Sequence, residues 1–192
     1  MPNLRTFVAV ELAAGVKARA AEAVRLLAES GADVSWAATG SMHLTLKFLG
    51  NVREEEMPDV CRVVTAAAAQ VETFEFLCRG IGAFPRNEEP RTIWIGIDEG
   101  AEALCGLQAT IEDALKRELG FPKEARRFLP HLTLGRVKRE ADPARNSLVE
   151  LINQMADFKA DLTAVDEAVV FSSFLRRSGP EYEAIVHAPL SG

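Results

Sequence analysis

Apolar and polar positions follow two different periods along the first half of the chain. Every-other-residue alternation predicts a strand, and apolar positions three or four apart predict a helix face. Residues 15–30, for example, place Val16, Ala20, Val24 and Leu27 on one helical face, and Gly31 follows as a helix stop. The first half is therefore predicted to contain strand, helix, strand, helix and strand, at residues 4–12, 15–30, 41–50, 54–70 and 74–84.

The same order of elements returns in the second half of the chain. A strand, a helix, a strand and a helix are predicted at residues 92–98, 102–119, 131–137 and 143–155. Residues 158–190 then read as two or three strands with a turn at Ser178-Gly179-Pro180. The chain thus repeats one unit of strands and helices, although its two halves share little sequence.

This repetition favours an α+β fold over the alternatives. We expect a duplicated, two-lobed domain over residues 1–192 with pseudo-twofold symmetry, its lobes near 1–88 and 89–192. Antiparallel or mixed sheets would line a central cleft, with helices packed outside; exchange of strands between the lobes stays open. A parallel α/β sheet also fits the mixed order, but no glycine-rich phosphate loop follows any strand.

Composition restricts the class of protein and the cell compartment that we expect. The net charge of −6 counts against a protein that coats nucleic acid, but not against an enzyme that binds one terminal phosphate. The cysteines Cys61, Cys78 and Cys105 match no zinc or redox spacing, so we expect buried apolar residues in a reducing compartment. The sequence shows no signal peptide, and no apolar run approaches the roughly 20 residues that cross a bilayer. We therefore expect a cytoplasmic monomer without membrane contact.

Two of the three histidines stand in an identical string, His-Leu-Thr-Leu, at residues 43–46 and 131–134. Side chains two apart on a strand share a face, so His43 and Thr45 point one way, as do His131 and Thr133. The leucines between them point to the opposite face and anchor each strand in a core. One His-x-Thr is a weak signal, whereas a matched pair on equivalent strands is a strong one.

Two imidazoles and two hydroxyls around a phosphate make a complete acid–base site. With an ordinary pKa of about 6.5, one imidazole can accept a proton from water while the other donates one to a leaving oxygen. Threonine hydroxyls can donate hydrogen bonds to the non-bridging oxygens. This scheme needs no metal and no cofactor, and no carboxylate cluster adjoins either motif.

Strand alternation also sorts the cations near the motifs. Lys47 falls on the same face as His43, so we include it among the phosphate-binding candidates. Arg136 falls on the opposite face from His131 unless the backbone bends at Gly135, and with such a bend it becomes a candidate too. Further basic residues flank the second motif and predict a basic rim: Arg126, Arg127, Lys138 and Arg139.

Three other residues carry weaker expectations. Phe48 and Trp36 either stack on a base or pack in the core, and core packing is the stronger expectation. His187 has no threonine two residues later, so we expect a structural role for it.

The chain resembles the 2H phosphoesterases, and among them the RNA 2′,3′-cyclic phosphodiesterases first described as 2′-5′ RNA ligases. The similarity runs nearly end to end and is carried by Arg5-Thr6-Phe7-Val8-Ala9, Met42–Gly50, Gly82-Ala83-Phe84-Pro85, Arg91-Thr92-Ile93-Trp94, Arg127–Arg136 and the closing Gly-Pro-Glu-Tyr. Leu129 is a departure, standing where a polar residue is expected.

The resemblance implies a two-lobed fold and the opening of a terminal 2′,3′-cyclic phosphate to a 2′-phosphate. It assigns the proton donor to His43 and the proton acceptor to His131. The partners it implies are RNA ends with a cyclic phosphate, such as tRNA fragments, or cyclic nucleotides. Two alternatives stay open: 2′-5′ RNA ligation at the same site, and a non-catalytic module that binds nucleotides.

Overall fold

The computed structural model describes residues 3–138, 142–176 and 179–192. Within these residues the elements follow one another as β1 (Asn3–Glu11), α1 (Ala14–Ala28), β2 (Val34–Trp36), η1 (Thr39–Ser41), β3 (His43–Arg53), η2 (Glu54–Glu56), α2 (Met57–Ala68), β4 (Phe74–Phe84), β5 (Thr92–Ile97), α3 (Ala101–Leu119), β6 (His131–Val137), α4 (Arg145–Gln154), β7 (Lys159–Val165), β8 (Glu167–Arg176) and β9 (Gly179–Pro189).

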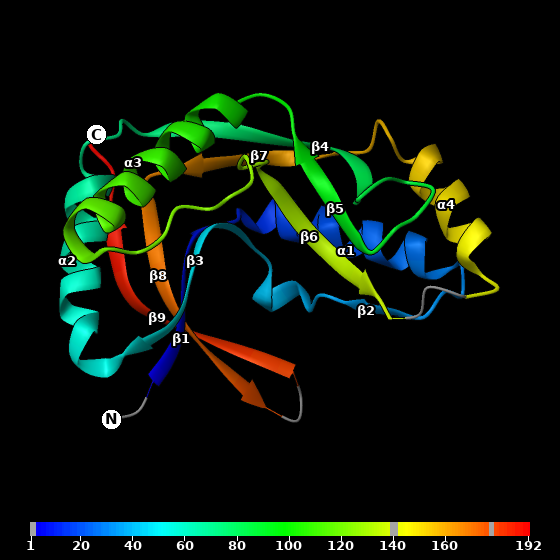
Figure 1. The fold of residues 1–192 in the computed structure, drawn as a ribbon. Helices are drawn as coiled ribbons and strands as arrows, with labels where there is room; N and C mark the ends of the chain where they lie inside the picture. Colours follow the sequence, from blue (N-terminus) through cyan, green and yellow to red (C-terminus); the bar gives the residue numbers. More distant parts are fainter. Residues whose placement is uncertain (1–2, 139–141, 177–178) are drawn as a thin grey trace.

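The described strands form two antiparallel sheets (Figure 1). The first has the strand order β3-β1-β8-β9, and the second has the order β2-β6-β5-β4-β7. Each pair within them is antiparallel. The α+β prediction is therefore confirmed, and the parallel α/β alternative is wrong.

The two sheets exchange strands across the sequence. β8 and β9, from the end of the chain, complete the sheet begun by β1 and β3, while β4 joins the second sheet. The boundary predicted near residue 88 therefore does not separate the two sheets. One motif strand nevertheless lies in each sheet, since β3 belongs to the first and β6 to the second.

Helices cover the outer face of each sheet. α2 contacts β8 and β9 and α3 contacts β3, whereas α1 contacts β6 and β7. The leucines of both motifs, Leu44, Leu46, Leu132 and Leu134, are at most 2% exposed and belong to the main core beneath these helices. Burying four leucines stabilises the fold by roughly 1.5–3 kcal/mol each, and this fixes the opposite faces of β3 and β6 as the ones free for chemistry.

The predicted helices and strands match the structure closely, but one short strand was missed. β2 is a strand of Val34–Trp36 that no sequence pattern predicted, because a strand this short gives no period to detect.

The cysteines are free thiols, but only Cys78 is fully buried; Cys61 and Cys105 are half-buried. The predicted turn at Ser178 lies outside the described residues.

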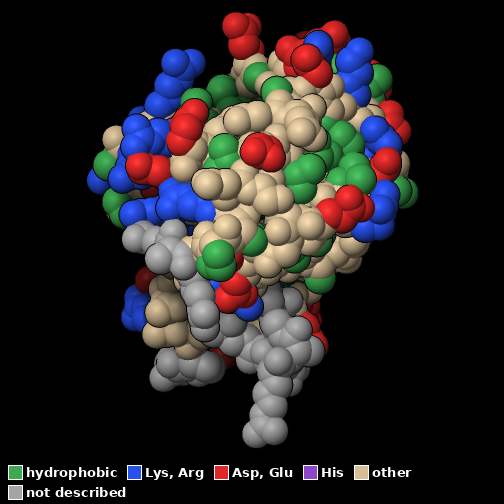
Figure 2. All heavy atoms as spheres, turned by 90° about the vertical axis from the view of Figure 1, so that its right-hand side faces the viewer, with side chains coloured by type: hydrophobic (Ala, Val, Ile, Leu, Met, Phe, Trp, Pro, Cys, Tyr) green, Lys and Arg blue, Asp and Glu red, His purple; other side chains and the backbone are tan. Residues whose placement is uncertain are grey.

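The face that carries α4 shows a mixed charge distribution (Figure 2). Lys and Arg side chains lie among Asp and Glu side chains there, around a mixed apolar and polar centre.

Among the described residues, no helix has the length and apolar character needed to cross a membrane.

Candidate active site

The two motif strands share one burial pattern. From His43 to Leu49 and from His131 to Val137, the side chains run half-buried, buried, half-buried, buried, buried, exposed, half-buried. The first three positions show that each histidine shares a face with its threonine, as predicted. The two consecutive buried positions show where alternation fails, and they occur at the same place in both strands.

A β-bulge causes this failure. The pairing of β1 with β3 shifts between Thr45 and Lys47, and the pairing of β5 with β6 shifts between Thr133 and Gly135. Each bulge adds one residue, so the side chains that follow it change face. In β3 this holds until a second shift in the pairing at Leu49. The fifth residue after each histidine therefore returns to the histidine face: Phe48 in β3 and Arg136 in β6.

The bulge overturns the prediction for Lys47. Its side chain is 2% exposed and lies on the helix side of β3, where Nζ donates to Glu112 Oε1 at 2.7 Å and to the Pro122 carbonyl at 2.9 Å. The same Glu112 oxygen accepts the Glu124 N–H at 2.9 Å. Lys47 is thus committed to a buried ion pair and does not share the face of His43.

The bulge in β6 brings Arg136 onto the histidine face of its strand, whereas the bulge in β3 takes Lys47 away from that face. Arg136 pairs across the sheet with Thr92, two residues from Trp94, which pairs with Thr133. Paired residues in an antiparallel sheet share a face, so Arg136 lies on the face of His131 and Thr133. Strict alternation is wrong here, and the bend allowed for at Gly135 is the bulge itself.

Both imidazoles are held in the same way. His43 Nδ1 lies 2.9 Å from the Ser41 carbonyl oxygen, and His131 Nδ1 lies 2.7 Å from that of Leu129. A carbonyl only accepts, so each Nδ1 carries a proton and donates it. The neutral ring then has its lone pair on Nε2, which makes Nε2 the atom that accepts or gives a proton in chemistry.

Burial lowers the pKa of both histidines. For His43 the desolvation is opposed by the hydrogen bond to Ser41 and reinforced by the charge of Lys17. For His131 it is opposed by the bond to Leu129 and reinforced by the charge of Arg136. Both rings therefore favour the neutral form below the ordinary pKa of about 6.5, and an anionic ligand would favour protonation again.

Aromatic rings surround the first histidine. Phe7 stacks on His43 with ring centroids 4.7 Å apart, and Tyr182 meets His43 edge-on at 5.1 Å. Phe7, Ala9, Val169 and Phe171 form a small buried cluster on the same face of the first sheet as Thr45, apart from the main core. The first sheet thus presents an aromatic wall beside His43.

The second histidine has a different setting. Phe84 meets His131 edge-on at 5.0 Å, and Trp94 lies beside Phe84 at 5.3 Å. A side chain at Gly82 would collide with the Trp94 ring, so this glycine gives the indole its place. Sequence reasoning did not assign Phe7, Tyr182, Phe84 or Trp94 to the site, because ring contacts across strands leave no local pattern.

The two motif strands lie against each other. β3 is an edge strand of its sheet, β6 pairs with β2 only at Gly135–Val137, and β3 contacts β6. Arg136 acts electrostatically on His131 and also on Tyr182, the ring beside His43. Burial raises the pKa of Tyr182, while Arg5 and Arg136 oppose the rise. Arg136 therefore lies close enough to side chains of both sheets to act on each of them.

Other sequence candidates have mixed outcomes. Trp36 is half-buried and packs against the core, but Phe48 is 57% exposed, so the expectation of core packing is wrong for Phe48. Leu129 is 52% exposed and acts through its carbonyl. In the predicted basic rim, Arg126 and Arg127 are exposed and Lys138 pairs with Asp33 at 3.1 Å; Arg139 lies outside the described residues.

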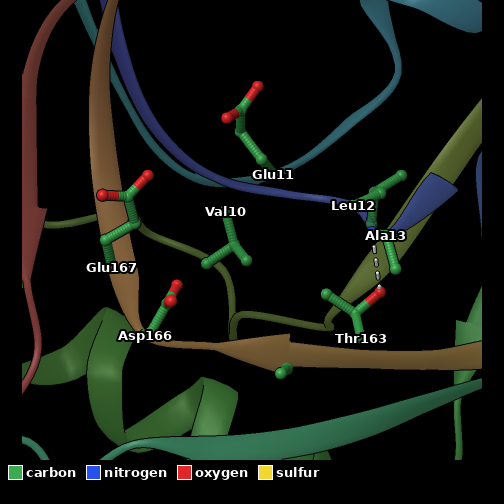
Figure 3. A pocket seen from close by; sticks show the side chains of 8 residues that line it. Val10, Glu11, Leu12, Ala13, Thr163, Asp166 and Glu167 are labelled. Atoms are coloured by element: carbon green, nitrogen blue, oxygen red, sulfur yellow. Dashed lines mark hydrogen bonds between the residues drawn. The ribbon is translucent and has the colours of Figure 1, made fainter. Parts of the chain in front are cut away.

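A hollow of about 280 Å³ opens at the end of β1, where Glu11 pairs with His43 across the sheet (Figure 3). It is lined by Val10–Ala13, Thr163, Ala164, Asp166 and Glu167, and Thr163 Oγ1 accepts the Ala13 N–H at 3.3 Å. Within the described residues, Glu11, Glu167 and His187 could together hold a metal ion, their ligand atoms all lying within 4.8 Å of one another. His187 Nδ1 is 2.7 Å from Glu167 Oε1.

Comparison with known families identifies the architecture. Residues 12–173 match the model of the 2′-5′ RNA ligase superfamily, a span that contains both His-Leu-Thr-Leu strings. The chain belongs to the 2′-5′ RNA ligase superfamily.

Curated members of the 2′-5′ RNA ligase superfamily match most of the chain. A Thermotoga maritima protein named RNA 2′,3′-cyclic phosphodiesterase is 31% identical over 189 residues, which cover 98% of this chain and 97% of that protein. An Aeropyrum pernix protein of the same name is 34% identical over 170 residues, covering 86% and 93%.

Two solved structures share the fold. A Thermus thermophilus protein aligns with a TM-score of 0.81 at 27% identity, covering 98% of both chains. E. coli LigT in complex with 3′-AMP aligns with a TM-score of 0.76 at 22% identity, covering 99% of both. The two-sheet arrangement is therefore shared with both of these proteins.

Proposed function

We propose that this protein is an RNA 2′,3′-cyclic phosphodiesterase, a hydrolase that opens the terminal cyclic phosphate to a 2′-phosphomonoester by acid–base catalysis between His43 and His131. The observation that carries the proposal is the matched pair of histidines, each held through Nδ1 by a carbonyl two residues earlier. Each Nε2 is thereby left as the reactive atom. The relatives named as RNA 2′,3′-cyclic phosphodiesterases support this substrate class.

The reaction can be written as one in-line displacement. Nε2 of neutral His131 accepts a proton from a water whose oxygen attacks phosphorus. The P–O3′ bond breaks, and protonated His43 gives its Nε2 proton to the departing O3′. The product carries a 2′-phosphate and a free 3′-hydroxyl, and the two histidines have exchanged protonation states, which solvent then restores.

The remaining residues stabilise the transition state. The Thr45 and Thr133 hydroxyls share a face with their histidines and donate hydrogen bonds to the non-bridging oxygens, where charge must be held. Arg136, returned to that face by the bulge, offsets the same charge. Each proton transfer contributes on the order of 10²–10⁴ in rate.

Product analysis tests the proposal. An RNA oligomer ending in 2′,3′-cyclic phosphate is incubated with excess EDTA, and we expect a 2′-phosphate and no 3′-phosphate. His43→Ala and His131→Ala should each lower turnover at least about 100-fold. His187→Ala is the matched control, since this third histidine pairs with Glu167, and it should keep wild-type turnover. Loss of activity with chelator, or a 3′-phosphate product, would contradict the scheme.

Ligation is the second candidate, favoured by the name of the superfamily model. With a 5′-hydroxyl in place of water as the nucleophile, the same two histidines can support attack on the cyclic phosphate, which breaks the P–O3′ bond and forms a 2′-5′ linkage. tRNA halves with a cyclic phosphate and a 5′-hydroxyl separate the two reactions. Accumulation of joined product over hydrolysed product would make ligation the principal activity.

A further inference from the structure

The histidine face of the first sheet carries opposite charges at its two ends. Glu11 pairs with His43 across the sheet, and every second residue of β1 back to Arg5 shares this face. Arg5, near the start of β1, therefore lies on the same face as Glu11 at its end. The buried side chains of Phe7 and Ala9 separate the two charges.

The end of this face beside His43 is acidic. Glu11 and Glu167 stand there on the neighbouring strands β1 and β8 (Figure 3). Their carboxylate oxygens and a ring nitrogen of His187 all lie within 4.8 Å of one another, so one imidazole faces two carboxylates. A phosphate brought to this end meets like charge and is repelled.

The opposite end of the face is basic and polar. Arg5 pairs with Asn51 on one side and with Ser173 on the other, and Ser173 pairs in turn with Tyr182. Paired residues share a face, so these four side chains form one row across the sheet. The Arg5 side chain is exposed, and no ion pair or hydrogen bond of its guanidinium falls within the described residues. Its charge is available to a ligand.

Tyr182 connects this row to the first motif. Its ring meets the His43 ring edge-on, with the two centroids 5.1 Å apart. The charges of Arg5 and Arg136 both oppose the rise in the pKa of Tyr182 that burial causes, so both guanidinium groups lie near this phenol. Tyr182 thus spans the space between Arg5 and His43.

We infer that Arg5 binds the phosphate on the 5′ side of the terminal nucleotide, so that the RNA strand leaves the active site over the start of β1. This inference rests on the proposed function and adds to it the path of the strand. A guanidinium binds phosphate through two parallel hydrogen bonds, and the hydroxyls of Ser173 and Tyr182 offer further donors in the same row. Attraction at this end and repulsion at the acidic end favour the same direction.

The path gives RNA ends an advantage over cyclic mononucleotides. RNA carries one phosphate per linkage, whatever the base, so a contact with that phosphate carries no sequence information. A cyclic mononucleotide has no phosphate on its 5′ side and gains nothing from Arg5. The contact therefore selects strand ends of any sequence.

Three substrates test this path. Adenosine 2′,3′-cyclic phosphate lacks the second phosphate, the dinucleotide ApA with a 2′,3′-cyclic phosphate has it, and a methylphosphonate linkage in that dinucleotide removes its charge. Arg5→Ala should lower kcat/KM for the charged dinucleotide about 3- to 30-fold and leave the other two unchanged. Arg5→Lys keeps the charge without the paired hydrogen bonds, so it should lose less. Unchanged turnover of the mononucleotide also shows that each variant is folded.

Two control variants use the ratio of kcat/KM for the charged dinucleotide to kcat/KM for the mononucleotide. Arg53→Ala removes another exposed guanidinium from this end of the sheet, one that pairs with Glu55 and Glu56, and should leave the ratio unchanged. Glu11→Gln should also leave it unchanged. A ratio that rises in Glu11→Gln and stays constant in Arg5→Ala would place the strand over the acidic end and overturn the inference. Equal loss on the charged and methylphosphonate dinucleotides in Arg5→Ala would overturn it too.

Binding separates a failure of this path from a failure of the proposed function. If the wild type opens none of the cyclic phosphates, the proposed hydrolysis is wrong, but calorimetry with adenosine 2′-phosphate and with ApA ending in a 2′-phosphate still measures the contact. Weaker binding of the dinucleotide alone in Arg5→Ala supports the path. Equal affinity of the wild type and Arg5→Ala for the dinucleotide refutes it.

Discussion

At the scale of single residues, the site depends on how each imidazole is oriented. A hydrogen bond from Nδ1 to a backbone carbonyl fixes the ring and its tautomer without using another side chain. Burial then lowers the pKa of both rings. In the proposed reaction two nearly identical groups act on one phosphate, and only their neighbours distinguish the acid from the base.

The acid role of His43 can be separated from the base role of His131 by the leaving group. p-Nitrophenolate leaves as a stable anion and gains little from a general acid. On a ribose cyclic phosphate, His43→Ala should lower the rate on the order of 10²–10⁴-fold. On bis(p-nitrophenyl) phosphate, the same variant should therefore lower the rate far less. His131→Ala should lose activity on both substrates. The opposite pattern in steady-state rates would exchange the two roles.

The charge of Arg136 should be visible in the pH profile. Both histidines have lowered pKa values, so kcat/KM should be bell-shaped with its optimum below neutral pH. Burial is the larger cause for His131 and Arg136 adds to it, so Arg136→Ala should raise the pKa of His131 and move the acidic limb to higher pH. Lys138→Ala, whose cation pairs with Asp33, should leave that limb in place.

At the scale of elements, the bulges decide which side chains share the histidine face of each motif strand. Sequence alternation predicts the His-Thr face correctly over three residues and then fails at Lys47 and Arg136. A bulge depends on how a strand pairs with its neighbour, which a single strand does not encode. In β6, the glycine at position 135 was a partial sign of the bulge in the sequence. A side chain there would come 2.7 Å from the Trp36 ring, so the close packing requires glycine. Lys47, at the same place in β3, gave no such sign.

The buried ion pair of Lys47 links the first motif strand to the segment that leads to the second. Lys47→Met would leave Glu112, 12% exposed, without its cation, and should destabilise the fold by about 3 kcal/mol in urea unfolding. Restoring an apolar pair with Lys47→Met and Glu112→Leu together should recover most of that loss. Lys116→Met, at an exposed position on α3, is the matched control and should stay within about 0.5 kcal/mol. If Lys47→Met were as stable as the wild type, the ion pair would not stabilise the fold.

At the scale of the whole molecule, the repeat in the sequence and the repeat in space differ. The order of elements was predictable because each helix and strand has its own period. Which strand joins which sheet was not, because pairing partners are far apart in the chain: β1 pairs with β8, and β4 pairs with β7. The exchange ties the two ends of the chain into one sheet, so neither half of the sequence forms a complete lobe.

The overall charge limits how the protein would bind the proposed RNA substrate. The net charge is −6, and Lys and Arg side chains lie among acidic ones on the face shown in Figure 2, so binding through a broad basic surface is not expected. Contact with one or two phosphates gives a slope of log(kcat/KM) against log[KCl] of about −0.7 to −1.4 on single-stranded RNA. An RNA oligomer and a cyclic mononucleotide should then respond to salt almost equally. A slope steeper than about −3 for the oligomer alone would mean that further phosphates are bound along the strand, and that the cleft acts as part of a longer RNA groove.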